Sequence, residues 1–306
     1  MGRYRIGVDL GGTKTEAVLL DGQSRIARRE RVPTPGDYAG IVGAITTLVE
    51  RAADGLPGGL GSVGRIGVCT PGTEYGPDML IANSNTPSIR DMPLRRDLRE
   101  ALRRDDVAIE NDANCFALAE SVMGAGSGYD VVFGVIMGTG VGGGIVIGKR
   151  IHRGASGIAG EWGHHTLHAG GNRCYCGRNG CVETYLSGPA LESGWAQMTG
   201  RAAGMPQISE HVTPDGDIAG DARGLEGARA WLEEAIDNFG LALANVVDIL
   251  DPDAIVMGGG LSNMDVWYGA GAESVRKNVF SSLASDVPIL RNRLGDSAGV
   301  IGACLI

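Results

Sequence analysis

Short apolar runs recur along the chain, and stretches with helical periodicity separate them. Runs rich in valine and isoleucine that are bounded by polar or glycine residues are typical of buried strands. The strands that we expect cover residues 4–8, 15–20, 65–69, 107–110, 131–137, 145–147 and 254–257. Helices are expected over residues 38–53, 94–104 and 227–248, from Asn111 or Asp112 onward, and over 295–306. Strands that alternate with helices in this way predict an α/β fold.

One local pattern occurs twice. Residues 4–20 hold two expected strands around the turn DLGGTK, and residues 131–147 hold two more around GTGVGGG. The second segment has no charged residue and approaches the length of a membrane span. Its glycines would weaken a helix, and its valine and isoleucine runs favour strands. We therefore interpret it as two buried strands joined by a glycine loop.

Composition narrows the class of protein. A chain of 306 residues is long enough for two lobes around a cleft. It has 51 glycines without a regular period, which indicates tight turns and close approach of the backbone to a ligand. The formal net charge of −9 argues against binding to nucleic acid. The N-terminus lacks the apolar core of a secretory signal, so we expect a cytoplasmic protein with reduced thiols.

Three glycine turns are candidates for binding a nucleotide. DLGGTK offers backbone N–H groups, a hydroxyl and a cation to phosphate oxygens, and Asp9 could hold Mg²⁺ through water. GTGVGGG could form a second phosphate loop, and GGG at 258–260 could lie against a base or ribose. Each turn also has a simpler explanation, namely a hairpin turn or a packing turn. The expected contacts are Asp9, Gly11, Gly12, Thr13, Lys14, Gly138, Thr139, Gly140, Gly258, Gly259 and Gly260.

Three cysteines, Cys174, Cys176 and Cys181, follow a cluster of histidines in the order C-x-C-x₄-C. Three thiolates and one histidine form a closed tetrahedral zinc site, and such a site is structural because no coordination position stays open. From the sequence alone His164, His165 and His168 are all possible fourth ligands.

The order of DLGGTK, ENDANCFALAE, GTGVGGG, GEWGH, CYCGRNGCVET and DPDAIVMGGGLSN resembles the ROK family of sugar kinases and sugar-sensing repressors. The resemblance implies two actin/hexokinase-like (ribonuclease H-like) α/β lobes with ATP in the cleft between them. We expect a small lobe over residues 1–113 and a large lobe over 114–294 that carries the zinc site. The helix within 295–306 would then return to the small lobe.

The resemblance also implies roles for single residues. It makes Asp112 the catalytic base and His164 the zinc ligand beside the three cysteines. Asp112 also suits a helix N-cap, and the two roles are compatible. We assume an ordinary carboxylate pKa for it. The sugar contacts implied are Asn85, Asn111, Asp112, Glu161, His164 and Glu183. In this interpretation the zinc site holds sugar contacts and leaves the nucleotide loops free, and the second ring nitrogen of His164 meets a sugar hydroxyl.

These expectations define a function. We expect an ATP- and Mg²⁺-dependent kinase with a structural Zn²⁺ that phosphorylates a hexose, at its 6-hydroxyl, with fructose or mannose favoured. The alternative is an N-acetylglucosamine kinase, or a kinase of N-acetylmannosamine or glucose; a non-enzymatic sugar sensor is more distant. The first expected strand begins by Tyr4, which leaves no room for the DNA-binding domain of the family's repressors. We expect a homodimer that binds neither nucleic acid nor membrane.

Overall fold

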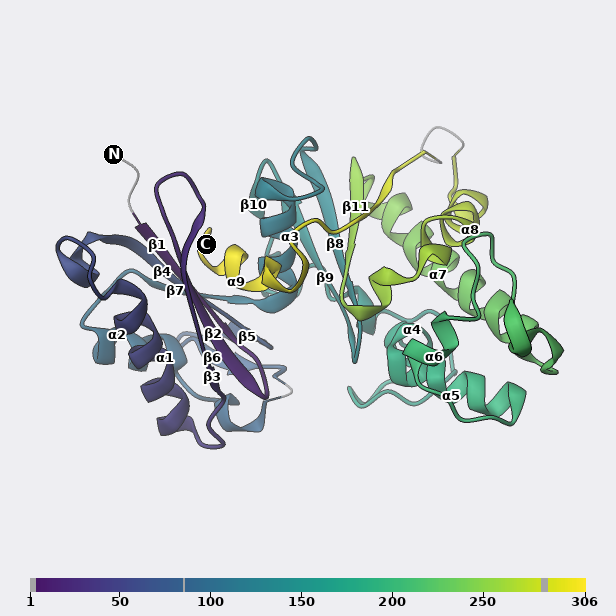
Figure 1. Ribbon diagram of the computed structural model, residues 1–306, viewed down its shortest axis with the longest axis horizontal. Helices are drawn as coiled ribbons and strands as arrows, with labels where there is room; N and C mark the ends of the chain where they lie inside the picture. The colour runs from purple at the N-terminus through teal and green to yellow at the C-terminus, as the bar shows by residue number, and fades with distance from the viewer. Residues whose placement is uncertain (1–3, 85, 282–285) are drawn as a thin grey trace.

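The computed structural model describes residues 4–84, 86–281 and 286–306. Within these residues ten strands form two five-stranded sheets, which lie in separate halves of the molecule with α3 (Asp112–Met123) and α9 (Ala298–Ala303) between them (Figure 1). None of the helices in the described ranges combines the length and apolar character needed to cross a membrane.

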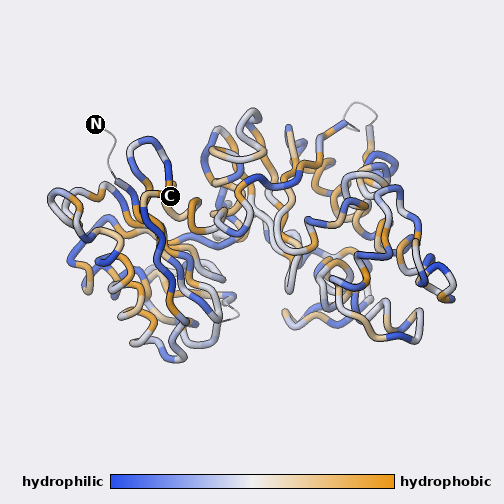
Figure 2. Tube along the Cα trace, in the orientation of Figure 1, coloured by the Kyte–Doolittle hydropathy of each residue, from blue (hydrophilic) through white to orange (hydrophobic). Residues whose placement is uncertain are grey.

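The first sheet has the order β3-β2-β1-β4-β7. Its strands are β1 (Tyr4–Leu10), β2 (Lys14–Leu20), β3 (Ile26–Pro33), β4 (Val63–Thr70) and β7 (Val107–Asn111). The first three are antiparallel neighbours, whereas β1, β4 and β7 run parallel. Apolar residues of α1 (Tyr38–Ala53) and α2 (Leu94–Leu102) form one core with this sheet. The short apolar helix α9 (Ala298–Ala303) also contacts β1 and β4 (Figure 2).

The second sheet has the order β10-β9-β8-β11-β12. Its strands are β8 (Val131–Met137), β9 (Val141–Ile147), β10 (Arg150–Ile151), β11 (Ala254–Gly258) and β12 (Ile289–Arg291). Alternate residues of a strand face opposite sides of a sheet. Accordingly Ile255 and Met257 pack in the core formed with α7 (Ala228–Leu250), while Val256 packs with α3 (Asp112–Met123).

Shorter elements complete the described chain. The strands are β5 (Thr73–Tyr75) and β6 (Leu80–Ala82), and the helices are α4 (Glu183–Leu186), α5 (Gly188–Thr199), α6 (Met205–Ser209) and α8 (Ala270–Asn278). The 3₁₀ helices are η1 (Gly59–Ser62), η2 (Pro87–Ile89), η3 (Trp162–His164), η4 (Gly220–Gly224), η5 (Gly260–Asn263), η6 (Asp265–Trp267) and η7 (Gly295–Ser297).

All seven expected strands are present, and the helix over 38–53 has the expected bounds. The strands β5, β6, β10 and β12 and the helices α5, α6 and α8 were not predicted, and the C-terminal helix covers only Ala298–Ala303 of the expected 295–306. Two further details differ from expectation. The loop expected over 138–144 is shorter, because β9 already begins at Val141 and takes up Gly142–Gly144 as strand residues. The edge strand β3 was not expected, because its sequence IARRERVP contains no apolar run.

The chain passes from one sheet to the other at a single short connection. Strand β7 ends at Asn111 in the first sheet, and α3 begins at Asp112 and packs on β8 and β9 of the second. The return passes through η7 and α9, which packs on α3 as well as on the first sheet. Residue 112 therefore stands where both sheets meet.

Candidate active site

A cleft of about 890 Å³ opens at this meeting point, with lining residues from both sheets' connections. It gathers five of the predicted sugar contacts, which are Asn111, Asp112, Glu161, His164 and Glu183. Gly138, Thr139 and Gly140 of the second glycine turn line the same cleft. Asn85 lies outside the described residues, so its place is not assigned.

Asp112 is set in place by the residue before it. The Asn111 side chain is the N-cap of α3 and accepts hydrogen bonds from the backbone N–H groups of Ala113 at 2.9 Å and Asn114 at 3.2 Å. Asp112 accepts a second bond from the Ala113 N–H at 2.8 Å. Because Asn111 caps the helix, the Asp112 carboxyl group remains accessible from the cleft.

The pKa of Asp112 departs from the ordinary carboxylate value expected from the sequence. Desolvation by the surrounding protein raises the pKa to about 6, and the charges of Asp9 and Glu161 add to the increase. A carboxyl group with this pKa is still mostly ionised at neutral pH, yet it is a stronger base than an ordinary aspartate.

Glu161 and Glu183 stand on opposite sides of the cysteine segment in sequence. Burial raises the pKa of Glu161, His164 lowers it, and the charge of Glu183 raises it further. The Glu183 carboxylate accepts a hydrogen bond from the Val141 N–H at 2.9 Å, directly after the second glycine turn. The Gly188 N–H also donates to the Gly138 carbonyl at 2.7 Å. The expectation that the zinc segment leaves this turn free is therefore wrong.

The first glycine turn is closed by its own backbone, through Gly11 N–H to the Lys14 carbonyl at 3.1 Å. Gly12, Thr13 and Lys14 are exposed. Asp9 lies at the end of β1, where the Cys69 thiol donates to its carboxylate at 3.1 Å, and burial raises its pKa. These turn residues do not line the 890 Å³ cleft, although the charge of Asp9 reaches Asp112.

The third glycine turn is explained in large part by packing. A Cβ atom on Gly258 would lie 2.4 Å from the Phe116 ring, and one on Gly259 would lie 2.3 Å from the Met137 carbonyl oxygen. Gly260 has no such neighbour among the described residues, and its nitrogen lies 3.8 Å from a Cβ placed on Gly138. The second and third turns are thus adjacent, and only Gly260 of the three leaves open space. Nucleotide contact at Gly258 and Gly259 stays a prediction.

The predicted metal ligands are brought together. The donor atoms of His164, Cys174, Cys176 and Cys181 all lie within 4.8 Å of one another. His164 Nδ1 is 3.7 Å from Cys174 Sγ, and Cys176 Sγ is 3.6 Å from Cys181 Sγ. A tetrahedron with zinc–sulfur bonds of about 2.3 Å has sulfur–sulfur edges of about 3.8 Å, so the donor set fits Zn²⁺.

The two rival histidines have other partners. His165 Nδ1 is 2.7 Å from the Trp162 carbonyl oxygen, and His168 Nε2 is 2.6 Å from Asn238 Oδ1. Among the three histidines considered from the sequence, only His164 belongs to the described group of possible metal ligands.

Tyr175 was not predicted as a site residue. It is 78% exposed, lines the cleft, and places its hydroxyl 3.1 Å from Nε2 of His164. This ring nitrogen was expected to meet a sugar hydroxyl, and here the Tyr175 hydroxyl occupies that position. The sequence did contain a signal for this role. Tyr175 lies between Cys174 and Cys176, and a metal bound to these cysteines would fix the backbone of Tyr175.

The two α/β lobes and the cleft between them define the class of two-lobed, actin/hexokinase-like proteins, and comparisons with solved structures confirm this fold. The structure of the ROK hexokinase from Thermus thermophilus has a TM-score of 0.84 and 35% identity, with 99% of this chain and 97% of that chain covered. A ROK family glucokinase from Streptomyces griseus, in complex with glucose and AMPPNP, has a TM-score of 0.73 and 32% identity over 98% of each chain.

The sequence comparisons agree. A profile of the ROK family matches residues 5–306. The N-acetyl-D-glucosamine kinase of Pectobacterium carotovorum subsp. carotovorum (strain PC1) is 35% identical over 310 residues, which covers 98% of this chain and 97% of that protein. The chain belongs to the ROK family.

Proposed function

We propose that this protein is an ATP-dependent sugar kinase that phosphorylates the 6-hydroxyl of N-acetylglucosamine. From the sequence we expect fructose or mannose, with N-acetylglucosamine as the alternative. The relatives named as N-acetyl-D-glucosamine kinases, at 35% identity over nearly the whole chain, support the alternative instead.

The observation that carries the kinase activity is the position of Asp112. Its carboxyl group lies in one cleft with Glu161, Glu183 and the second glycine turn, and its pKa is raised to about 6. In phosphoryl transfer the base orients the hydroxyl and takes its proton late, as the oxygen–phosphorus bond forms through a loose transition state. We assign this role to Asp112, with its neighbour Asn111 and the two glutamates as hydrogen-bond partners of the sugar hydroxyls.

The turns supply the complementary charge. Exposed N–H groups of the glycine turns and the Lys14 ammonium would offset the charge on the transferring phosphoryl oxygens. Asp9 is the residue that would hold Mg²⁺ through water, and the ion would neutralise part of the phosphate charge. His164 and the three cysteines would hold a structural Zn²⁺. The protein would act as a cytoplasmic homodimer.

One part of the cleft wall suits an acetamido group. Ile158 is 51% exposed and lines the cleft, as do Pro71 and Ala82. The Thr73 hydroxyl donates to the Gly157 carbonyl at 3.2 Å, which places the Ile158 segment beside β5. An apolar surface there would contact a methyl group better than it would contact a sugar hydroxyl.

A coupled assay of ADP release tests the proposal, with MgATP and fructose, mannose, glucose, N-acetylglucosamine and N-acetylmannosamine as acceptors. We expect the highest kcat/KM with N-acetylglucosamine, and a 6-phosphate product by NMR. A higher kcat/KM with fructose or mannose would overturn the substrate, and no ADP release with any acceptor would overturn the activity. Metal analysis and light scattering check the zinc and the dimer.

A further inference from the structure

A buried carboxylate lies two residues before the proposed base in the sequence. Glu110 is the last residue but one of β7, and its side chain is only 3% exposed. One carboxylate oxygen accepts hydrogen bonds from the Asn111 N–H at 2.9 Å and the Asn114 side-chain amide at 3.0 Å. Both donors belong to the turn that opens α3. Glu110 therefore holds the backbone that presents Asn111 and Asp112 to the cleft.

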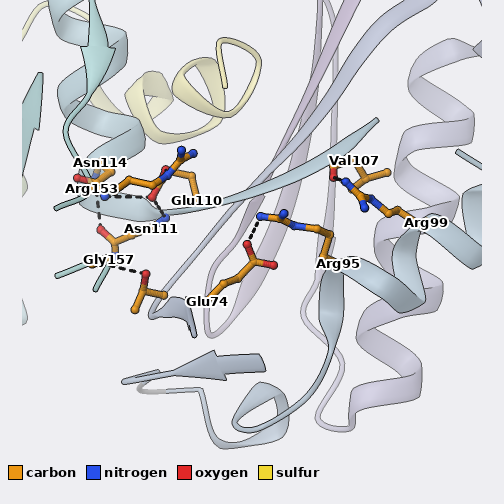
Figure 3. A network of polar contacts seen from close by, with 10 residues as sticks. Glu74, Arg95, Arg99, Val107, Glu110, Asn111, Asn114, Arg153 and Gly157 are labelled. Atoms are coloured by element: carbon orange, nitrogen blue, oxygen red, sulfur yellow. Dashed lines mark hydrogen bonds and ion pairs between the residues drawn. The ribbon is translucent and has the colours of Figure 1, made fainter. Parts of the chain in front are cut away.

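The second carboxylate oxygen of Glu110 contacts the segment that follows β10 of the second sheet. It accepts a hydrogen bond from Nε of Arg153 at 2.5 Å, in an ion pair between residues 43 positions apart (Figure 3). Arg153 follows β10 and opens the segment that leads to Glu161. The same segment is closed on itself by the Ala159 N–H bonded to the Arg153 carbonyl at 3.2 Å. A movement of Arg153 would therefore reach the residues just before Glu161.

A second contact joins the same two parts of the chain. The Thr73 hydroxyl of β5 donates to the Gly157 carbonyl at 3.2 Å, and the Asn111 side-chain amide donates to the Gly72 carbonyl at 3.3 Å. Residues 153–161 are thus fixed to the first-sheet side at two points, Arg153 and Gly157. The contact at Gly157 is a neutral hydrogen bond, whereas the contact at Arg153 is an ion pair. Its carboxylate, Glu110, also holds the turn that carries Asp112.

From this geometry we infer that Glu110 and Arg153 form a positioning pair, which fixes the segment carrying Glu161 relative to the turn carrying Asn111 and Asp112. The inference rests on the proposed function, since it treats these residues as partners in one sugar site. Neither Glu110 nor Arg153 touches the reacting atoms in this account. They act by keeping the proposed base and a proposed sugar contact, which come from different sheets' connections, at a constant separation.

A neighbouring ion pair offers a matched control. Glu74 of β5 pairs with Arg95 of α2, in the same polar region but entirely on the first-sheet side (Figure 3). Glu74 is as buried as Glu110, with a side chain 6% exposed. If buried ion pairs here only stabilise the fold, loss of either pair should have the same kinds of consequence. If Glu110 and Arg153 position the site, only their loss should change the kinetics of folded enzyme.

The test compares Arg153→Met, Arg153→Lys, Glu110→Gln, the Glu110→Gln/Arg153→Met double variant and Arg95→Met in the full chain. The Arg153 side chain is 56% exposed, so its replacement should leave the protein folded. We expect Arg153→Met to lower kcat/KM for the sugar about tenfold to 100-fold, because small misplacements of reacting groups have effects of this size. The KM for ATP should change less than about threefold. Arg153→Lys should restore part of the loss, and the double variant should be little worse than either single one.

Hydrogen exchange gives a readout that needs no activity. Peptides within residues 152–161 should exchange faster in Arg153→Met than in wild type, and not in Arg95→Met. The inference is overturned if Arg153→Met keeps wild-type kinetics and exchange, or if Arg95→Met loses as much kcat/KM as Arg153→Met. A wild-type protein inactive on every sugar would instead overturn the proposed function, and the exchange measurement would still decide whether the pair fixes the segment.

Discussion

The first glycine turn (DLGGTK) and the second (GTGVGGG) each join two strands, yet glycine has a different role in each. In the first turn, a Cβ atom on Gly12 would meet no heavy atom of the described chain within 4 Å. In the second turn a Cβ on Gly140 would lie 2.8 Å from the Glu183 carboxylate. In β9, which follows this turn, a Cβ on Gly144 would lie 2.7 Å from the Ala113 carbonyl oxygen. At Gly12 the first turn has room for a side chain, whereas the second turn and the strand after it are packed on two sides.

The difference follows from what covers each sheet. Helix α3 lies on β8 and β9, and its close approach requires strand positions without side chains. The same helix carries Asp112 at its start. Glycine in the second turn and in β9 therefore lets α3 approach closely and so positions the proposed base. Glycine in the first turn leaves backbone N–H groups accessible to a ligand. Substitutions in and around the two turns should therefore separate these two uses of glycine.

The largest effect is expected at Asp112, which stands where the two units meet. Asp112→Asn keeps the shape of the side chain but removes the proton acceptor, so kcat should fall about 100-fold to 10,000-fold. Isothermal titration should show sugar and a nonhydrolysable ATP analogue still binding. Because the folded protein raises the pKa of this carboxyl group, its ionised form is disfavoured, and the variant should melt higher than wild type at pH 8. A variant that keeps most of its kcat would remove Asp112 from the role of base.

Cys176→Ser tests whether the second turn depends on the metal segment. Loss of one zinc ligand should lower the melting temperature and raise the sugar KM strongly, by about 100-fold, because the segment also presents Glu161 and Glu183. Since Glu183 accepts from the Val141 N–H, the KM for ATP should rise too, but less. Cys304→Ala, a buried thiol outside the metal group, is the control. An unchanged ATP KM would mean that the second turn holds its shape without the metal segment.

The sequence predicted the positions of long, regular features well. The strand over 131–137 and the helix over 38–53 lie at the expected residues, since each is a continuous apolar run or an amphipathic period. Strand β3 was missed because an edge strand can consist of charged residues whose partners, such as Glu16 for Arg31, lie on the neighbouring strand. The ROK motifs identified five residues that the cleft gathers.

Contacts between distant segments were beyond the sequence. Nothing in the local pattern relates Glu183 to Val141, or Glu110 to Arg153, because the members of each pair lie 42 and 43 positions apart in the sequence and become adjacent only in the folded chain. The expected independence of the second turn was wrong for this reason. The pKa of Asp112 likewise depends on protein packed around it from both sides of the cleft.

Gly144→Ala and Gly12→Ala form a matched pair for the two uses of glycine. The added methyl group at residue 144 would collide with α3, so we expect a loss of about 1–3 kcal/mol in the free energy of unfolding, together with a lower kcat. At residue 12 the melting temperature should stay within about 1 °C, because surface changes without strain have small effects. The KM for ATP should nevertheless rise about tenfold if the Gly12 N–H approaches a phosphate. Denaturant unfolding and steady-state kinetics measure both, and equal losses of stability would contradict the comparison.

The pH profile of kcat/KM tests whether Asp9, beside the first glycine turn, raises the pKa of Asp112. Only the ionised form of Asp112 can take a proton, so kcat/KM should fall below pH 6, by about tenfold at pH 5. The charge of Asp9 contributes to the raised pKa of Asp112. Asp9→Asn should therefore move the inflection to lower pH, whatever it does to the maximum rate. A profile that is flat between pH 5 and 8 would exclude Asp112 as the titrating group, and an unmoved inflection would exclude the influence of Asp9.

The smallest effect is expected at Tyr175, where a substitution should change sugar binding without changing ATP binding at either turn. Its hydroxyl lies 3.1 Å from His164 Nε2, and its ring meets the His164 ring edge to face with centroids 5.3 Å apart. Partial desolvation of the hydroxyl and the charge of Glu183 raise the pKa of Tyr175 to about 12, so the hydroxyl stays protonated throughout the pH range of the assays. Tyr175→Phe keeps the ring and removes only the hydroxyl, so the KM for the sugar should change about threefold, the range expected for one neutral hydrogen bond. A fall would mean that the sugar competes with the hydroxyl for His164, and a rise would mean that the hydroxyl contacts the sugar itself. The KM for ATP should be unchanged in either case, because neither glycine turn contacts Tyr175 through any hydrogen bond between described residues. Tyr129→Phe, which lies outside the cleft lining, is the control, and equal sugar KM values for wild type and Tyr175→Phe would show that the hydroxyl has no part in the site.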